Sequence, residues 1–507
     1  MLVRLGYFAV IASLVFFGQV SQARSNDQRP FRLEQCPLTE IKQSFLNYLR
    51  GCLSDDARIV LKGEGNYKAI NEHWSDLAEL NATAIVQPAN VRDVQQVIDF
   101  VKHYNIDFAI KSGGHNCNPS HSGSEGGLLL DLGLLNSIEY STKSKTVALG
   151  PGARWGDVDK HLAKFGRAAV GGRVSNVGVG GFTLGGGYGW KTGQHGLASD
   201  NLVEVEMVIA DGRSLRVSKT EHPDLFFAIR GGGGQFGVAT KFTFETFEQN
   251  GKIFSGFLFY RSGQIKPLAK LVANWSANNK DPKANLLLVF ARPPPSFEPT
   301  SVVQVWYDGN AEQARKVFKD FYDLGAFQDT TEEMEYWKGN TLQDPLTTTG
   351  DLKFLSAVSA SKITPDLVET AFDYYTEFTD AIPDAVQTTI LIEPTFQGAF
   401  RGVKDADSAY PHSKANHIVG IVPRWKDHKL TGKVLRWIRK GEVILRKGNE
   451  ANALYPNYSI YDEPVEHLFR GNLARLQNIK RAYDEECLFR HGFIIPTDAC
   501  TRCPVGV

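Results

Sequence analysis

Three glycine-rich segments hold the residues of this sequence that are best suited to chemistry. They are KSGGH (Lys111–His115), VGVGGFTLGGGYGW (Val177–Trp190) and RGGGGQFG (Arg230–Gly237). Glycine lets backbone N–H groups approach an anion closely, and successive N–H groups form an anion-binding nest. A single cluster is more typical of a tight turn, but three clusters in one domain favour an extended diphosphate ligand. The positions expected to contact that ligand are Lys111, Ser112, Gly113, Gly114, Gly178, Val179, Gly180, Gly181, Gly185, Gly186, Gly187, Gly189 and Val238.

The glycine spacing does not fit the common nicotinamide or P-loop sites. Gly232, Gly234 and Gly237 match GxGxxG, but they follow a predicted helix and precede a predicted strand. A dinucleotide-binding turn of the Rossmann type requires the reverse order, strand before helix. The sequence also contains no GxxxxGK[ST] motif. The clusters therefore indicate a different nucleotide-binding fold.

The elements that must position these clusters change in character near residue 250. Before it, short strands surround a predicted helix that starts after a possible N-cap, Asn90, and runs to about Asn105. The dense glycines between Ala168 and Gly196 argue against any regular element there. After residue 250, apolar strands alternate with amphipathic helices, which predicts an α+β domain with an antiparallel sheet backed by helices. The final segment is expected to return to the first domain.

The N-terminus predicts export. Arg4 precedes a short apolar run, and the small residues that follow give a cleavage site after about Ala23, so residues 1–23 are expected to be a signal peptide. An uncleaved anchor is disfavoured because the apolar run is too short to span a bilayer comfortably. Sequons at Asn81 and Asn274 agree with a secreted glycoprotein. In an oxidising compartment the six cysteines can form disulfides, whose pairing the sequence leaves open.

The charge balance and composition exclude some classes of binding partner. The 56 lysine and arginine residues balance the 56 aspartate and glutamate residues, so no nucleic-acid or membrane partner is expected. Cys500 and Cys503 are the one CxxC pair, and no second pair or paired histidine spacing accompanies them, so no metal site is expected. We expect a monomer that takes a small-molecule substrate.

Four segments in order carry a family resemblance. KSGGH, GPGARWGDV (Gly150–Val158), VGVGGFTLGGGYGWKTGQHGLASDN (Val177–Asn201) and RGGGGQFG resemble the berberine-bridge-enzyme-like branch of the vanillyl-alcohol-oxidase flavoproteins. YPNYS (Tyr455–Ser459) and RLQNIKRAYDEECLF (Arg475–Phe489) resemble the C-terminal signature of that branch. The resemblance implies a two-part, PCMH-type FAD-binding domain over 24–250 (core about 78–249), a substrate cap over 251–430, and a C-terminal segment, 431–507, returning to the FAD domain.

The resemblance also implies one covalent link to FAD. His115 maps onto the histidine that bonds the flavin 8α-methyl carbon; without the motif, a solvated loop histidine would be an equal reading. Many relatives add a cysteine link, but that position here is Val174, which cannot form a thioether. We therefore expect FAD bound monocovalently through His115. Cys117 is interpreted as a disulfide partner or buried thiol rather than a flavin ligand.

Oxidation of a carbinol needs a base for the hydroxyl proton while hydride moves to flavin N5. The family's YxN tyrosine maps onto Tyr455, with Asn457 near the flavin; Tyr458 is the alternative base or a core aromatic. His195 is read as a turn histidine rather than a catalytic one. Asp200 and Asn201 are expected to bind backbone or the adenosine side of FAD. In the cap, Glu393 and Gln397 lie on or just after a strand that could face the flavin, and Gln397 is a weak candidate for substrate contact.

The expected function is a secreted FAD-linked oxidoreductase that is reoxidised by O2, giving H2O2. Secretion favours a carbohydrate or alcohol substrate, whereas the missing cysteine link favours tailoring of a secondary metabolite. A flavin-carrying binding protein with little turnover is the alternative from another class, although it would not need Tyr455.

Overall fold

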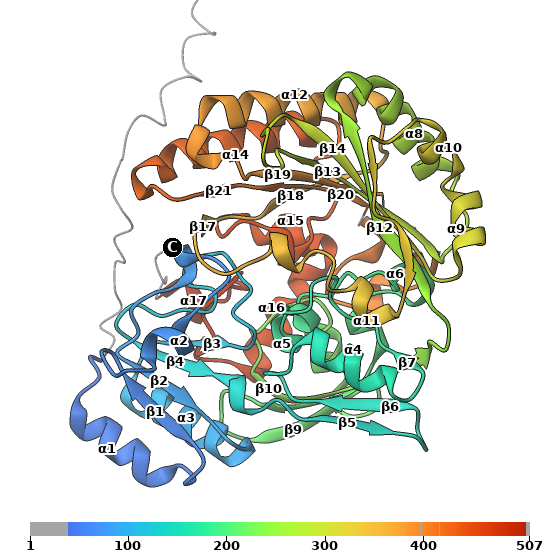
Figure 1. Ribbon diagram of the computed structural model, residues 1–507. Coiled ribbons are helices and arrows are strands. Elements are labelled where there is room, and N and C mark those ends of the chain that lie inside the picture. The colour runs from blue at the N-terminus through green and yellow to red at the C-terminus, as the bar shows by residue number, and fades with distance from the viewer. Residues whose placement is uncertain (1–38, 395–397, 415, 503–507) are drawn as a thin grey trace, which may run out of the picture.

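The computed structural model describes residues 39–394, 398–414 and 416–502. Two halves face each other across the molecule: a lower half that holds both N-terminal sheets, and an upper half built on one large sheet (Figure 1). The signal peptide expected at 1–23 lies outside the described residues. Within the described residues, no helix is long and apolar enough to cross a membrane.

The first sheet of the lower half has the strand order β1-β2-β4-β3, with β2, β4 and β3 parallel and β1 antiparallel to them. The strands are β1 (Arg58–Leu61), β2 (Ala84–Gln87), β3 (Phe108–Lys111) and β4 (Leu128–Asp131), accompanied by helices α1 (Gln43–Cys52), α2 (Tyr67–Asn71) and α3 (Val91–Tyr104). Asn90 caps α3 as expected, because its side chain accepts a hydrogen bond from the backbone N–H of Asp93. The parallel register delivers the KSGGH turn directly after β3.

The second sheet is antiparallel, in the order β5-β6-β10-β8-β9. Its strands are β5 (Ile138–Ser141), β6 (Thr146–Leu149), β8 (Leu202–Val208), β9 (Ser214–Ser218) and β10 (Val238–Glu245), with helices α4 (Trp155–Ala163) and α7 (Pro223–Ala228) and the small pair β7 (Arg167–Ala168) and β11 (Phe247–Glu248). The glycine-rich stretch does contain regular structure, contrary to expectation: α5 (Val179–Leu184) and α6 (Thr192–His195). Val179, Gly180, Thr183 and Leu184 form the buried side of α5, and Gly181 is exposed.

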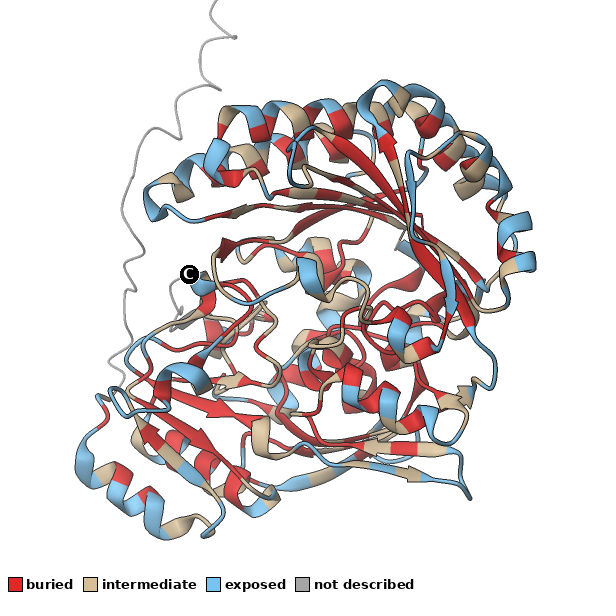
Figure 2. Cartoon of the chain, viewed as in Figure 1, coloured by how far each residue is buried: buried red, intermediate tan, exposed pale blue. Residues whose placement is uncertain are grey.

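The upper half is an antiparallel sheet in the order β15-β12-β14-β13-β19-β20-β18, with β16 also paired to β12. Its strands are β12 (Ile253–Arg261), β13 (Ala284–Ala291), β14 (Thr300–Tyr307), β15 (Gln328–Asp329), β16 (Glu332–Met334), β18 (Ser356–Ala360), β19 (Thr389–Glu393) and β20 (His417–Val422). The remaining elements are the pair β17 (Leu352–Lys353) and β21 (Arg424–Trp425), and helices α8 (Ile265–Asn278), α9 (Ala311–Val317), α10 (Lys319–Asp323), α11 (Tyr336–Gly339), α12 (Pro365–Ala381), α13 (Gly398–Arg401) and α14 (Thr431–Arg446). Helices α8, α12 and α14 cover the face of the sheet that points away from the lower half (Figures 1 and 2). These findings confirm the α+β class.

Helix α14 lies beyond the predicted boundary at residue 430 and packs on the cap sheet. The side chains of Val434, Ile438 and Leu445 are buried in the core of the upper half, in one cluster with strands of its sheet. The apolar stripe of this amphipathic helix needs a partner surface, and the cap sheet supplies it. We therefore propose that the cap extends to about residue 446 and includes α14.

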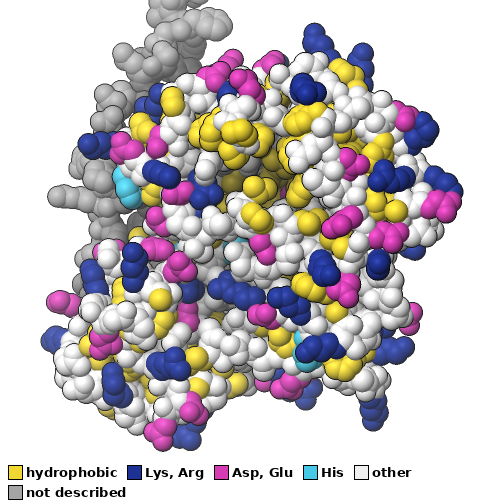
Figure 3. All heavy atoms as spheres, in the orientation of Figure 1, with side chains coloured by type: hydrophobic (Ala, Val, Ile, Leu, Met, Phe, Trp, Pro, Cys, Tyr) yellow, Lys and Arg dark blue, Asp and Glu magenta, His cyan; other side chains and the backbone are white. Residues whose placement is uncertain are grey.

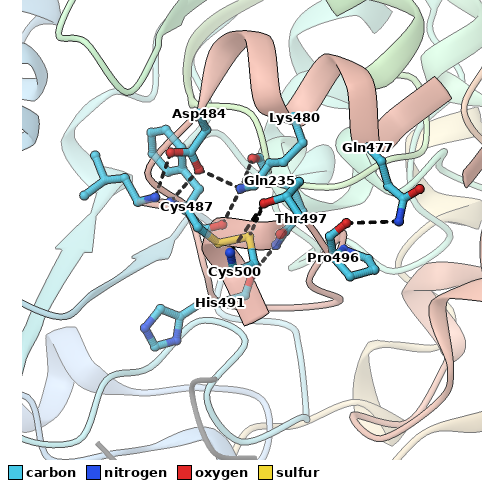
Figure 4. The surroundings of a disulfide bond; sticks show 11 residues. Gln235, Gln477, Lys480, Asp484, Cys487, His491, Pro496, Thr497 and Cys500 are labelled. Carbon is cyan, nitrogen blue, oxygen red and sulfur yellow. Dashed lines mark hydrogen bonds and ion pairs between the residues drawn. A yellow bond between two sulfur atoms is a disulfide. The ribbon is translucent and has the colours of Figure 1, made fainter. Parts of the chain in front are cut away.

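The C-terminal segment packs into the lower half. It contains α15 (Val465–Phe469), α16 (Leu473–Tyr483) and α17 (Asp498–Arg502), and Leu476 and Ile479 share a hydrophobic cluster with Phe242 of β10. The fully buried ammonium of Lys480 donates hydrogen bonds to Asp484 at 2.6 Å and to the Gln235 carbonyl at 2.6 Å (Figure 4). A disulfide between Cys487 and Cys500 closes the segment. The tail is thus fixed to the third glycine cluster.

Candidate functional site

A cavity of about 840 Å³, here called the central cavity, lies between the two halves. Residues of all three glycine clusters, of the cap sheet and of the C-terminal segment line it. Its volume is near the upper end of the range for ligand pockets, about 300–1,000 Å³. In the upper half of Figure 3, hydrophobic side chains gather where the surface is hollowed. Most of the residues expected to contact the ligand line this cavity: Ser112, Gly113, Gly114, His115, Gly178, Gly180, Gly181, Gly185, Val238, Tyr455, Asn457 and Tyr458.

The glycines of the clusters serve two different purposes: some allow two backbone segments to pack closely, and others leave open space beside the backbone. At Gly113 and Gly178 the two backbones pack so closely that a Cβ on either would lie 2.5 Å from the other's Cα. At Gly181, Gly233 and Gly234 a Cβ would meet no protein atom within 4 Å. A side chain at these three positions would instead project into the space beside the backbone, where N–H groups can approach an anion. The donor set therefore fits a dinucleotide such as FAD.

His115 lies on the cavity wall in a fixed orientation. Its ring stacks on Trp74 with centroids 5.2 Å apart, and Nε2 lies 3.0 Å from the Asn176 Oδ1. Burial lowers the pKa of His115 to about 4, and the nearby positive charges of Arg154 and Lys353 act in the same direction. The imidazole is therefore neutral at neutral pH and has a lone pair available on one nitrogen.

Three hydrogen bonds to its hydroxyl oxygen hold the Tyr455 side chain in place. This oxygen accepts hydrogen bonds from the backbone N–H groups of Gly187 at 2.9 Å and Tyr188 at 3.1 Å, and from Asn457 Nδ2 at 3.0 Å. Burial raises the pKa of Tyr455 to about 12, although these three donors oppose the rise. The Asn457 amide also donates to the Phe182 carbonyl at 3.0 Å. Tyr455 and Asn457 thus fix the second glycine cluster against the C-terminal segment.

Tyr458 has a different environment, shared with two charged residues. Arg173, on the loop before α5, forms an ion pair with Glu393 at the end of β19, and both side chains are about nine-tenths buried. The Arg173 guanidinium also hydrogen-bonds the Tyr458 hydroxyl and lies 5.0 Å from the centre of the Trp190 ring. Burial, followed by the Glu393 carboxylate, raises the pKa of Tyr458, while Arg173 lowers it. Arg173, Glu393 and Tyr458 all line the central cavity, so this trio brings a phenol, a carboxylate and a guanidinium to one wall.

Several of the expected site residues lie behind the wall. The Asp200 carboxylate receives hydrogen bonds from His412 at 2.9 Å and Arg230 at 3.0 Å, and the Asn201 amide donates to the carbonyls of His195 and Leu197. These two residues brace the loop that supports the second glycine cluster and do not line the cavity. The other expected contacts that are absent from the cavity wall are Lys111, Val179, Gly186, Gly187 and Gly189.

The remaining candidates divide as follows. Val174 lines the cavity, whereas His195 stacks on Phe247 with centroids 3.5 Å apart and is absent from the wall, as a turn histidine would be. Cys117 lines the cavity as a free thiol whose pKa burial raises to about 12, which makes it a poor nucleophile. Gln397 lies outside the described residues.

Sequence reasoning missed Asn176 and Arg173 as site residues. Arg173 precedes and Asn176 follows the expected cysteine position, Val174, and this short segment was interpreted only for its missing cysteine. A buried arginine opposite a strand-end glutamate leaves no local pattern, because the two are 220 positions apart. Arg154 was also missed; its guanidinium binds the carbonyls of Gly113 and Asn176 and so ties two glycine clusters together.

Comparison with known proteins agrees with this geometry. The family model for the FAD binding domain matches residues 82–218, and the model described as berberine and berberine like matches residues 454–496. The FAD-linked oxidoreductase pgmH of Aspergillus terreus is 28% identical over 485 residues, which cover 86% of this chain and 94% of that protein.

Two solved structures share the fold. Wild-type BBE-like 1 of Physcomitrella patens superimposes with a TM-score of 0.78 at 21% identity, covering 89% of this chain and 99% of that one. Glucooligosaccharide oxidase of Acremonium strictum, described with a 6-S-cysteinyl, 8α-N1-histidyl FAD, gives a TM-score of 0.78 at 22% identity, with 88% and 98% covered. The chain therefore has an FAD-binding domain and a berberine-like C-terminal domain, and it is an FAD-linked oxidoreductase like its relatives.

Proposed function

We propose that the protein is a secreted oxidase that carries FAD on His115 and oxidises a carbinol, with O2 as the electron acceptor and H2O2 as the product. The observation that carries this proposal is the trio of Tyr458, Arg173 and Glu393 on the wall of the central cavity, which residues of the glycine clusters also line. The signal-like N-terminus and the Cys487–Cys500 disulfide support secretion. Bound FAD supplies the hydride acceptor and passes the electrons to oxygen.

Tyr458 is the better base of the two tyrosines. The Tyr455 oxygen already accepts three N–H donors, so it has no free lone pair directed at a substrate. Tyr458 instead has a guanidinium beside its hydroxyl, which lowers the Tyr458 pKa against the raising effects of burial and of Glu393. Once ionised, Tyr458 takes the hydroxyl proton of the substrate while Arg173 compensates the charge. Glu393 holds the guanidinium in place.

The cap wall favours a largely apolar alcohol over a sugar as the substrate. Phe257 and Phe259 of β12, Leu287 and Val289 of β13, and Leu391 of β19 all present their side chains to the cavity. A sugar hydroxyl placed against these five side chains would lose hydrogen bonds to water without replacement, at a cost of about 1–3 kcal/mol each. The polar residues of the same wall include Gln304 and Thr389. This wall supports tailoring of a secondary metabolite rather than oxidation of an oligosaccharide.

The substrate class can be tested with a panel of aromatic and aliphatic alcohols beside soluble oligosaccharides, with peroxide release as the readout. Apolar alcohols should give the higher kcat/KM. Val289→Thr, which adds a hydroxyl at nearly constant volume, should raise KM for the apolar substrates without releasing flavin. Val443→Thr, on the exposed face of α14, is the matched control and should leave KM unchanged. A uniform preference for oligosaccharides would reject the apolar assignment.

The alternative of a flavin carrier with little turnover makes a distinct kinetic prediction. A carrier would bind FAD on the same glycine clusters but would react slowly with oxygen after reduction. Stopped-flow reoxidation of the dithionite-reduced protein separates the two functions, because an oxidase reacts quickly with O2. The position of the trio on the cavity wall supports turnover.

A further inference from the structure

Asn176 connects His115 to the cap. Its side-chain oxygen lies 3.0 Å from His115 Nε2, and its amide nitrogen donates to the Thr347 carbonyl at 3.4 Å. The backbone of Asn176 is held as well, because its carbonyl accepts a hydrogen bond from the Arg154 guanidinium. No catalytic step described above uses this residue.

The orientation of the Asn176 amide follows from its two neighbours. If the amide were flipped, its oxygen would face the Thr347 carbonyl oxygen, and two acceptors would oppose each other. The amide nitrogen therefore faces Thr347 and the amide oxygen faces His115. Because Oδ1 can only accept, the His115 Nε2 must carry the proton.

A neutral imidazole carries one N–H, so the proton on Nε2 leaves Nδ1 unprotonated. The Nδ1 lone pair is therefore available for bond formation.

We propose that Asn176 is a positioning residue for flavin attachment, which selects Nδ1 of His115 as the nucleophile by accepting a hydrogen bond from Nε2. This inference rests on the proposed covalent link. In the attachment step one C–H bond of the flavin 8-methyl group breaks and releases its proton, and the Nδ1 lone pair forms the new C–N bond. The ring system is left with two additional electrons, which dioxygen removes to give hydrogen peroxide. Asn176 Oδ1 also stabilises the positive charge that develops on the imidazole.

The test measures attachment rather than turnover. Wild type, Asn176→Leu and Asn176→Asp are incubated with excess FAD, and the share of chain that carries the flavin mass is followed by intact-mass spectrometry. Asn176→Leu should attach flavin about tenfold more slowly, because it loses the single acceptor for Nε2. Asn176→Asp, which keeps an acceptor, should attach flavin at least as fast as wild type. Wild-type rates in Asn176→Leu would overturn the proposal.

Ser175→Ala is the matched control. Ser175 lies next to Asn176 and bonds Asp344 of the cap at 2.6 Å without touching His115. Its loss weakens the same loop but leaves the acceptor intact, so attachment should stay at the wild-type rate. An equal slowing in Ser175→Ala and Asn176→Leu would overturn the specific role of Asn176.

A second measurement does not depend on the folding of any variant. The histidyl-flavin peptide is isolated from wild-type protein by proteolysis, and NMR identifies the substituted nitrogen. Substitution at Nδ1 supports the inference, and substitution at Nε2 overturns it while leaving the covalent link through His115 intact. A wild-type protein that carries no flavin on His115 would refute the covalent link and this inference together.

Discussion

The guanidinium of Arg173, in the FAD half, forms a buried ion pair with the carboxylate of Glu393, in the cap. The pair joins the two halves at the point where the Tyr458 hydroxyl reaches the same guanidinium. Removing one partner of a buried pair leaves an uncompensated charge, which costs about 3–5 kcal/mol. This contact therefore couples the position of the cap to the ionisation of the proposed base.

Substitution of Tyr455 and of Tyr458 should have different effects on activity and stability. Tyr458→Phe removes the proposed base and should lower kcat by about 10²–10⁴-fold, with little change in folding stability. Steady-state kinetics and thermal unfolding, measured on the same preparation, check both parts.

Tyr455→Phe should behave in the opposite way. It leaves the N–H groups of Gly187 and Tyr188 without their acceptor, which should cost about 1–3 kcal/mol of unfolding free energy. The folded fraction of Tyr455→Phe should have a higher kcat than the folded fraction of Tyr458→Phe. If Tyr455→Phe were the less active variant at full folding, the base would be Tyr455.

The pH dependence of the reaction should respond to Glu393. Because this carboxylate raises the pKa of Tyr458, Glu393→Gln should lower that pKa and move the rise of kcat/KM with pH toward lower pH. Arg173 has the opposite effect on the Tyr458 pKa, so Arg173→Gln should move the rise toward higher pH. Profiles of kcat/KM against pH for the two variants test this; shifts in the same direction would contradict the assigned roles.

The C-terminal disulfide should stabilise the return of the tail to the FAD half. Cys487 and Cys500 are 13 residues apart, and a loop of about that length contributes about 3 kcal/mol to stability in the chain-entropy account. Urea unfolding with and without a reductant measures the difference.

Cys117→Ser serves as the control for that experiment. Cys117 is a buried free thiol in the structure, so its replacement should leave the response to reductant unchanged. An unfolding midpoint that is insensitive to reductant in wild type would show that packing alone, through residues such as Lys480 and Leu476, secures the tail.

Local sequence signals predicted the parts of the fold that depend on interactions between residues close together in the sequence. The helix after Asn90, the turn after β3 and the α+β cap follow from capping, glycine placement and apolar periodicity. The boundary near α14 could not be predicted, because an amphipathic helix shows which face it buries but not which sheet receives it. The helix α5 was missed because glycine content alone argued against a helix there.

The residues of the candidate site also differ in how far local sequence signals predict them. His115 and most of the glycines could be proposed from the sequence because they lie in short motifs, and these residues line the central cavity. Arg173, Asn176 and Glu393 act through partners that are 61 to 220 positions away, so no spacing pattern marks them. Asp200 was assigned to the cofactor from its motif, but its partner His412 comes from a distant loop and holds it behind the wall.

Acid denaturation tests the central claim most directly. The purified protein is precipitated in acid, and the flavin absorbance of the pellet is compared between wild type and His115→Ala. The account predicts that the colour stays with the wild-type polypeptide, with one flavin per chain, and passes into the supernatant for His115→Ala. Flavin released from the wild type would contradict the link through His115.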